Sequence, residues 1–285
     1  MKILKKILIF TLRYSGFPLF VKYFIRRNKV TIVYYHDIDE VSFQRQIDFI
    51  SKRYSFITVD DLCAYLYKET EKLPHNPILI TFDDGHIGNY KLLEVIKRYN
   101  FKPTIFLTTD YINSNKPFWF KLPFKSHSEK EKLKKCTEES RISYLKEVYS
   151  KEINEYVEQA LSWNQVSEMK DYFNFHSHTH QHPCLPNCGK EYIEEELKVS
   201  KTIIEDQTQK SVYAIAYPNG DYSEQVISSA KDIGYKLGFT GKHGFASKKN
   251  NPLEIPRLSM NDTKNFNEFV LRLSGAWYLI KKIKI

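Results

Sequence analysis

The sequence predicts an α/β fold in which parallel strands form a barrel surrounded by helices. Short apolar runs typical of buried strands alternate with segments of helical periodicity along most of the chain. Polar residues stand at the ends of several of these runs, as they do at the rim of a parallel barrel. With 285 residues, 42% apolar and 27% charged, and no internal repeat or linker, the chain fits one large folded core.

The expected elements follow one another from residue 30 onward. The run at 78–82 is rich in β-branched residues, which is typical of a buried strand, and Asp60 is a good N-cap for the second helix. Residues 112–160 interrupt the alternation with an aromatic loop and a highly charged helical insertion. In chain order the expected strands lie at 30–35, 56–59, 78–82, 103–107, 172–175, 213–217 and 235–239, and the expected helices at 43–54, 60–67, 87–98, 164–171, 191–205 and 223–233.

The positive charge of the chain is concentrated at its two ends. The net charge is +9, but residues 1–29 contain eight Lys or Arg and no acid, and residues 276–285 contain three Lys and no acid. The body between them is therefore slightly negative. A nucleic-acid-binding body needs cations spread along a groove, so this distribution argues against nucleic acid as a partner.

Residues 1–29 are predicted to form a basic amphipathic segment at a membrane interface. No apolar run approaches the ~20 residues of a membrane-spanning helix. No cleavable signal peptide is evident, because Arg13 interrupts a short apolar run and no cleavage site follows. The alternative is that the basic ends form helices that cover the bottom of the barrel. On a helix, Ile3, Leu4, Ile7, Leu8 and Thr11 share one face, Lys2, Lys5, Lys6 and Arg13 lie mostly on the other, and Ile9 and Leu12 are exceptions.

The four cysteines indicate neither a disulfide framework nor a paired CxxC zinc site. They are Cys63, Cys136, Cys184 and Cys188. The last two follow a histidine-rich segment and could pair or bind metal, although reduced buried or loop thiols fit their spacing better. Reduced thiols lean toward the cytoplasm, so we expect a location peripheral to a bacterial membrane, with the cytoplasmic face favoured.

Two adjacent carboxylates, Asp83 and Asp84, follow the strand at 78–82, which ends at Gly85. The backbone turns at a strand end, so both side chains can face one cleft. Their repulsion costs energy unless a cation or a shared proton relieves it. The alternative is that Asp84 caps the following helix and Asp83 is merely solvated.

Four histidines stand at alternate positions about a hundred residues later: His176, His178, His180 and His182. If the chain turns after the strand, two histidines four apart come within ~6 Å of each other. Pro183 excludes a long helix there, so a single turn is expected. The chelating pair is then either the first and third histidine or the second and fourth. With Asp84 as a third ligand, the set leaves positions open for water and substrate, which is typical of a catalytic metal site.

Three motifs in this order resemble the polysaccharide deacetylase family, the NodB-homology domain of carbohydrate esterase family four. They are TFDDG at 81–85, HTHQHP at 178–183 and YPNGD at 217–221, and the resemblance covers roughly residues 30–260. The resemblance implies a distorted (β/α)7-type barrel, here with a helical insertion at about 112–160.

The same resemblance implies a set of site residues. Asp83 corresponds to the general base and Asp84 to a metal ligand. Family members usually carry Pro directly after the second histidine ligand, so the pair His178 and His182 is selected, with the other two histidines as bystanders. The ion is expected to be Zn²⁺ or another divalent cation such as Co²⁺ or Ni²⁺.

The chain departs from the family pattern at two motifs. Ala216 stands where the third motif usually has Arg, and the usual late Leu-x-His motif that supplies the general acid is absent. The chain resembles instead a permuted branch that includes poly-N-acetylglucosamine deacetylases, in which a Tyr-His at the end of the first strand supplies the acid. Tyr35-His36 matches, so His36 is the expected acid, the alternative being an unrelated strand-end histidine. Arg257 is a candidate for the missing Arg that orients Asp83.

The resemblance also implies how the substrate is held. The backbone N–H of Asn219 is expected to stabilise the oxyanion. Tyr217 and Pro218 of the third motif are expected to bind substrate. Apart from the resemblance, the aromatic Phe118, Trp119 and Phe120 could stack on sugar rings, or they could equally fill the core under the insertion. The expected substrate is an N-acetylated sugar in a bacterial surface polysaccharide or a lipid-linked glycan.

These predictions combine into one organisation of the chain. Residues 1–29 form the membrane-interface segment, residues 30–262 the catalytic domain, and residues 263–285 a C-terminal helix with a basic amphipathic end. The expected function is metal-dependent N-deacetylation. Two alternatives remain: a metal-dependent hydrolase of small cyclic amides on the same scaffold, and an inactive membrane-associated sugar-binding protein. The sequence does not define the sugar or the oligomeric state.

Overall fold

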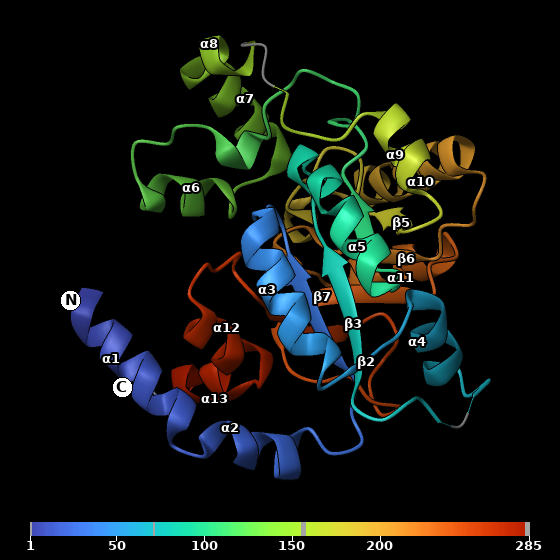
Figure 1. Ribbon diagram of the computed structural model, residues 1–285. Coiled ribbons are helices and arrows are strands. Elements are labelled where there is room, and N and C mark those ends of the chain that lie inside the picture. Colours follow the sequence, from blue (N-terminus) through green and yellow to red (C-terminus); the bar gives the residue numbers. More distant parts are fainter. Residues whose placement is uncertain (1, 71, 155–157, 283–285) are drawn as a thin grey trace.

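The computed structural model describes residues 2–70, 72–154 and 158–282 (Figure 1). The side chains of residues 1–5 and 281–285 lie outside this description. The predicted positions of Lys2, Ile3, Leu4 and Lys5 on a helix face therefore lie outside it as well.

Seven parallel strands close a barrel in the order β1-β8-β7-β6-β5-β4-β3 and back to β1. The short strand β2 adds to β3 at its N-terminal end. This arrangement confirms the predicted (β/α)7-type barrel. The strands are β1 (Thr31–Tyr35), β2 (Ser55–Phe56), β3 (Pro77–Phe82), β4 (Thr104–Leu107), β5 (Asn174–Ser177), β6 (Ala214–Ala216), β7 (Leu237–His243) and β8 (Ile255–Ser259).

Helices cover the outside of the barrel at nearly all the predicted positions. The helix after β2 is capped by Thr58, which forms a capping box with Asp61, so the prediction of Asp60 as its N-cap is wrong. The segment after β3 begins as a 3₁₀ helix, η2 (Ile87–Leu92). The main helices are α3 (Glu40–Ser51), α4 (Val59–Leu66), α5 (Leu93–Tyr99), α9 (Trp163–Met169), α10 (Lys190–Thr208) and α11 (Glu224–Asp232).

Three strands are shifted from their predicted ranges, and a further strand was not predicted. β2 covers only Ser55–Phe56, where 56–59 was expected, and β7 covers Leu237–His243, where 235–239 was expected. β5 begins two residues later than expected, at Asn174, and extends through Ser177. β8 was not among the predicted strands, since Pro256 and the charged Arg257 interrupt its apolar pattern. Arg257 lies inside the barrel, where it is paired with a carboxylate, so a charged residue is accommodated there.

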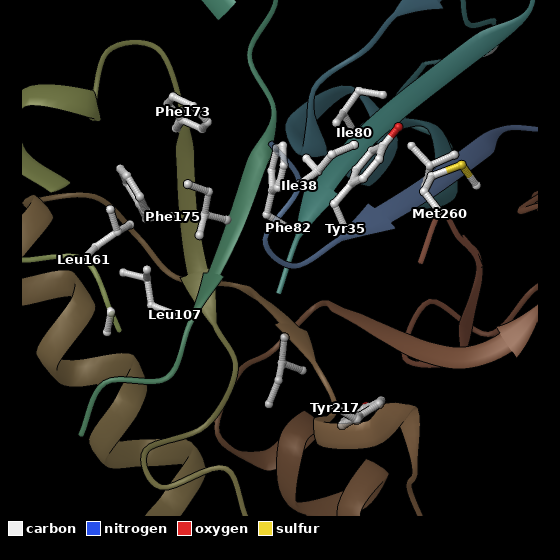
Figure 2. Packing of buried hydrophobic residues seen from close by; sticks show 14 of the residues in the cluster. Tyr35, Ile38, Ile80, Phe82, Leu107, Leu161, Phe173, Phe175, Tyr217 and Met260 are labelled. Carbon is white, nitrogen blue, oxygen red and sulfur yellow. The ribbon is translucent and has the colours of Figure 1, made fainter. Parts of the chain in front are cut away.

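The strands pack on both faces because their side chains alternate. Ile78, Ile80 and Phe82 of β3 face the helices and join the large outer cluster, part of which Figure 2 shows. Leu79 of the same strand joins a separate cluster with Phe106 and other residues of the barrel interior. This alternation fixes which residue at each strand end turns into the mouth of the barrel.

The insertion between β4 and α9 lies beside the carboxyl ends of the barrel strands, where Phe120, Lys130 and Lys134 border a cleft. Its helices are η3 (Trp119–Lys121), α6 (His127–Leu133), α7 (Glu138–Val148) and α8 (Ser150–Ile153). Phe118 and Trp119, at the start of this insertion, are buried. The insertion therefore contributes packing, as well as side chains, to the site described below.

The two ends of the chain pack together at the side and bottom of the barrel (Figure 1). Ile9 and Val21 pack against Leu271 and Ala276, while Ile7 and Leu8 remain exposed. Ile9 and Leu12, the two exceptions to the predicted helix pattern, therefore face the protein. Within the described residues, no helix combines the length and apolar character needed to cross a membrane. The elements involved are α1 (Lys2–Tyr14), α2 (Phe17–Phe20), the π-helical η1 (Val21–Ile25), α12 (Phe266–Leu273) and α13 (Ala276–Lys282).

Candidate active site

A cleft of about 420 Å³ opens at the carboxyl ends of the barrel strands. This is the end at which parallel α/β barrels place their functional groups. Most of the side chains in it are polar or charged. They belong to Tyr34, His36, Asp83, Asp84, Phe120, Lys130, Lys134, His178, His182, Asn219, Gly220, Gly241, Arg257 and Asn261.

Asp84, His178 and His182 converge at the floor of this cleft. Oδ1 of Asp84 lies 3.2 Å from Nε2 of His178 and 3.5 Å from Nε2 of His182. The three side chains are buried, and one potential ligand atom of each lies within 4.8 Å of the others. Two imidazole nitrogens and one carboxylate oxygen are a donor set that a divalent transition metal accepts with positions left open.

The protonation of this group also fits a metal site. Nδ1 of His178 lies 2.7 Å from the carbonyl oxygen of Ala216, which can only accept, so Nδ1 donates and the ring is oriented with Nε2 toward Asp84. Burial, together with the charge of His178, holds the pKa of His182 well below its ordinary value, so His182 is neutral. Burial alone would raise the pKa of Asp84, but the adjacent imidazoles of His178 and His86 outweigh it and hold the pKa well below its usual range.

A single tight turn brings the two histidines together. Thr179 has φ 70° and His182 φ 57°, so the strand ends abruptly after β5. The backbone N–H of Thr179 donates to Ser177 Oγ, and that of His182 donates to Thr179 Oγ1 at 3.1 Å. The intervening N–H groups of residues 180 and 181 both donate to Oε2 of Glu196 on α10. The predicted turn after the strand is present, and a buried carboxylate stabilises it.

The other two histidines of the segment point elsewhere. His176 lies inside the barrel against Phe106 and Tyr213, and burial lowers its pKa to about 3. Nδ1 of His180 lies 2.8 Å from Thr109 Oγ1, away from the cleft. Of the two pairs that the sequence allowed, the structure brings together His178 and His182.

Asp83 lies beside the cluster of Asp84, His178 and His182 without belonging to it. The guanidinium of Arg257 donates to both of its oxygens, from Nη1 at 2.8 Å and from Nη2 at 2.9 Å. Both residues are almost fully buried. Arg257 comes from β8, which is separated from β3 by β1, and its bidentate bond fixes the carboxylate in one orientation. The predicted pairing of Arg257 with Asp83 is present.

His36 stands at the rim of the cleft at the end of β1, with 39% of its side chain exposed. Its Nδ1 lies 3.5 Å from Oδ2 of Asp262, and its backbone N–H donates to Oδ1 of the same residue. Burial lowers the pKa of His36, but Asp262 and the charges of Asp84 and Asp83 outweigh this and raise the pKa to about 9. His36 is therefore protonated at neutral pH.

Two residues of the site were missed by sequence reasoning. His86 is buried, and its Nε2 lies 3.0 Å from Oδ2 of Asp84, while its Nδ1 lies 3.1 Å from Lys121 Nζ. Asp262 is the partner of His36 just described. His86 follows the TFDDG motif by one residue, which was an available signal, but nothing in the sequence links position 262 to position 36.

The predicted substrate-binding residues do not line the cleft. Phe118, Trp119, Tyr217 and Pro218 are buried, so they present no free surface for a sugar, and this corrects the prediction. Trp119 instead donates from Nε1 to the carbonyl oxygen of His182 at 2.9 Å, and Phe118 packs against His86. Of the three aromatic residues that the sequence offered for stacking on a sugar, Phe120 lines the cleft, where its ring packs against His182.

The turn at Pro218–Gly220 brings Asn219 to the opposite wall of the cleft. Asn219 has φ 57°, and the turn packs directly on β7, since a Cβ at Gly220 would lie 2.2 Å from the backbone nitrogen of Gly241. Only glycine permits that approach. The side chain of Asn219 donates to Sγ of Cys184 at 3.4 Å. All four cysteines are free, and neither Cys184 nor Cys188 belongs to the cluster of Asp84, His178 and His182.

Comparison with known proteins identifies the family of this chain. A family profile described as polysaccharide deacetylase matches residues 70–238, which is more than half of the sequence. The chain therefore belongs to the polysaccharide deacetylase family. The matched segment contains Asp83, Asp84, His178 and His182, whereas His36 and Arg257 lie outside it.

Individual relatives are distant. The YxkH protein of Bacillus subtilis, which carries the name of a polysaccharide deacetylase, is 23% identical over 199 residues, with 70% of this chain and 56% of that protein covered. The poly-beta-1,6-N-acetyl-D-glucosamine N-deacetylase of Staphylococcus epidermidis is 22% identical over 237 residues, with 80% and 69% covered. This chain thus spans little more than half the length of YxkH.

The solved structure of the Streptococcus pyogenes deacetylase PplD in complex with acetate shares the fold of this chain. The TM-score is 0.65 at 23% identity, over 86% of this chain and 98% of that one. The two chains therefore share their overall fold.

Proposed function

We propose that this protein is a metal-dependent N-deacetylase that hydrolyses the N-acetyl group of a sugar in a bacterial surface polysaccharide or lipid-linked glycan. The observation that carries the proposal is the convergence of Asp84, His178 and His182 beside a second, separately held carboxylate, Asp83. Family membership and the relative that acts on poly-N-acetyl-D-glucosamine support the substrate class.

In this proposal Asp84, His178 and His182 hold a divalent cation, with Zn²⁺ as the first candidate and Co²⁺ or Ni²⁺ as others. Such an ion would supply Lewis-acid polarisation of the acetyl carbonyl and of the attacking water. The deprotonated carboxylate of Asp84 and the neutral imidazole of His182 are already in the protonation states that metal binding requires.

The remaining groups divide the proton transfers between them. Asp83 accepts the proton of the attacking water, and Arg257 holds its carboxylate in position for this. The backbone N–H of Asn219 donates to the developing oxyanion. His36, protonated at neutral pH, donates a proton to the leaving amine, which is too basic to depart as an anion.

We also propose that the amphipathic ends hold the protein at the surface of a bacterial membrane, with the cytoplasmic face favoured by the free cysteines. Large apolar side chains are exposed along the N-terminal helices. They are Ile7, Leu8, Phe10, Tyr14, Leu19, Phe20, Tyr23 and Phe24. This location suits a substrate that is itself attached to the membrane.

Acetate release tests the deacetylase proposal directly. We expect the purified protein to release acetate from an oligomer of N-acetylglucosamine, to lose this activity when a chelator removes the metal, and to regain it with added Zn²⁺. A de-N-acetylated oligomer is the matched control that yields no acetate. Hydrolysis of small cyclic amides without acetate release favours the first alternative, and oligomer binding without turnover favours the second.

The protonated state of His36 predicts an alkaline limit to the activity. A raised pKa means that the proton is present below pH 9 and lost above it, so kcat/KM is expected to fall as the pH rises through about 9. Asp262→Asn removes the neighbouring charge, so the pH at which kcat/KM falls should move down toward the ordinary histidine pKa of about 6.5. The measurement is a pH profile of kcat/KM for the metal-saturated enzyme.

The control for this profile is Asp232→Asn, which removes an exposed carboxylate on α11 and should leave the alkaline fall of kcat/KM at the same pH. If the Asp262→Asn profile matches that of the unmodified protein, another group sets the alkaline limit.

A further inference from the structure

A second cavity, of about 830 Å³, lies at the opposite end of the barrel from the active-site cleft. It is formed by the segment that links η1 to β1 and by the loop that precedes β3. Its described lining residues are Lys22, Tyr23, Phe24, Arg26, Arg27, Asn28, Lys29, Val30, Tyr65, Lys72, Leu73, Pro74, His75, Asn76 and Pro77.

The charge of this cavity is strongly positive. Five of its described lining residues are Lys or Arg, and none of them is a carboxylate. Like charges gathered in one concave space repel, so the arrangement costs energy unless an anion occupies it. The cations at this end of the barrel therefore favour the binding of an anion.

Arg26 gives the cavity a specific anion-binding group. The residue is only 5% exposed, and its Nη2 donates to Oδ1 of Asn76 at 3.1 Å. The guanidinium lies over the ring of Tyr54, 4.6 Å from its centre, which fixes its plane. Its Nη1 has no hydrogen-bond partner within the described structure. A buried guanidinium nitrogen without a partner is costly, and an oxygen of a bound anion would satisfy it.

One wall of the cavity is apolar and continues onto the exposed surface. Tyr23 is 61% exposed and Phe24 73% exposed, and both line the cavity. The ring of Phe24 stacks on Phe20 at 4.9 Å, which in turn stacks on Phe17. Aromatic side chains of this kind insert at the boundary between lipid headgroups and acyl chains. The anion-binding groups and the apolar surface are thus parts of one continuous face.

We propose that this cavity binds the phosphate headgroup of an anionic membrane lipid. The guanidinium of Arg26 and the surrounding cations match a phosphate, because Arg donates to two phosphate oxygens from one plane. The exposed rings of Tyr23 and Phe24 match the acyl chains attached to that headgroup. The inference adds a specific lipid site to the membrane contact proposed above, and it is independent of the deacetylase chemistry at the other end of the barrel.

Vesicle binding of the full chain tests this site. The probes are vesicles of phosphatidylcholine with and without phosphatidylglycerol, at physiological ionic strength. Replacing two exposed cavity cations, in Arg27→Gln/Lys72→Gln, is expected to weaken binding to the anionic vesicles by about 25-fold. The matched control, Lys132→Gln/Lys146→Gln, removes the same charge from exposed positions of the insertion and should retain most of the binding.

The outcomes separate the possible sources of the phosphate. Inorganic phosphate is expected to compete weakly, since it lacks the acyl chains. Tight binding of inorganic phosphate by a protein that ignores anionic vesicles overturns the proposal, as does equal loss in the two double variants. Arg26→Gln should weaken anionic binding further, with thermal unfolding as the check on folding. Acetate release measured on a soluble oligomer should be unchanged in the Arg27→Gln/Lys72→Gln variant, so failure of the lipid site is distinguished from failure of the deacetylase proposal.

Discussion

Replacing Asp83 with asparagine is expected to reduce kcat for acetate release by about 10³-fold while the protein still binds its metal. General-base catalysis contributes roughly 10²–10⁴ in rate, and an amide of the same shape cannot accept the proton of the attacking water. The metal-binding group is intact in this variant, because Asp84, His178 and His182 do not depend on Asp83 for their contacts. The measurements are steady-state kinetics and the metal content of the purified variant.

This substitution also changes a buried ion pair, so its effect on folding must be separated from its effect on chemistry. Asparagine retains one oxygen that can accept from Arg257, but the charge that balances the buried guanidinium is lost, and loss of a buried partner typically costs about 3–5 kcal/mol. We therefore expect a lower Tm together with retained metal. The control is Asp110→Asn, which alters the partly exposed pair with Lys116 and should leave kcat unchanged. Normal turnover by folded Asp83→Asn protein would remove Asp83 from the mechanism.

The sequence predicted the parts of the fold and site that are encoded locally. A β-branched run that ends at two acids had to be a strand with both carboxylates near its end, and the alternation of strands and helices brought that end to the barrel mouth. Histidines four positions apart can meet at one ion only if the chain turns, and Pro183 just after them limits any helix there to a single turn. The structure shows both features, with Asp84 lying 3.2 Å from His178.

The parts that could not be predicted depend on contacts between segments distant in the sequence. Asp262 reaches His36 only because β1 and β8 are neighbours where the barrel closes, and β8 itself does not have a strand-like sequence. The aromatic residues near 119 face inward because the insertion folds over them and Trp119 binds the His182 carbonyl. Hydrophobic pattern alone does not distinguish an aromatic residue that contacts sugar from one that fills a core.

The N-terminal helix α1 is a second case in which the sequence pattern does not show which apolar residues are buried. Ile9 looked like an exception to an amphipathic pattern, yet it is the residue that packs against α12 and α13. One apolar face of this helix packs against the protein, while its other apolar residues remain exposed and are available to contact a partner or a membrane. Periodicity identified the excess of apolar residues, but only the packing shows which of them remain at the surface.

Replacing His182 with glutamine is expected to weaken metal binding by at least about 100-fold and to abolish acetate release at ordinary metal concentrations. Changes to residues that merely orient a ligand cost 10–100-fold in metal affinity, and loss of a ligand should exceed that. The measurements are chelator competition to obtain the metal Kd, and activity as a function of added Zn²⁺. High Zn²⁺ should restore little activity, because a two-ligand site leaves the ion free to bind in unproductive geometries.

The chain provides its own control for this variant two residues away. His180→Gln changes the same residue type on the same turn, but its imidazole faces Thr109, so metal affinity and kcat should stay close to those of the unmodified protein. His176→Gln is a less suitable control, because His176 is buried inside the barrel and its replacement tests packing. If His180→Gln loses metal and His182→Gln keeps it, the ligands are the first and third histidines of the segment, and the turn must rearrange when the ion binds. Equal retention in both would mean that the metal is held elsewhere, and the proposed chemistry at Asp83 and His36 would have to be abandoned with it.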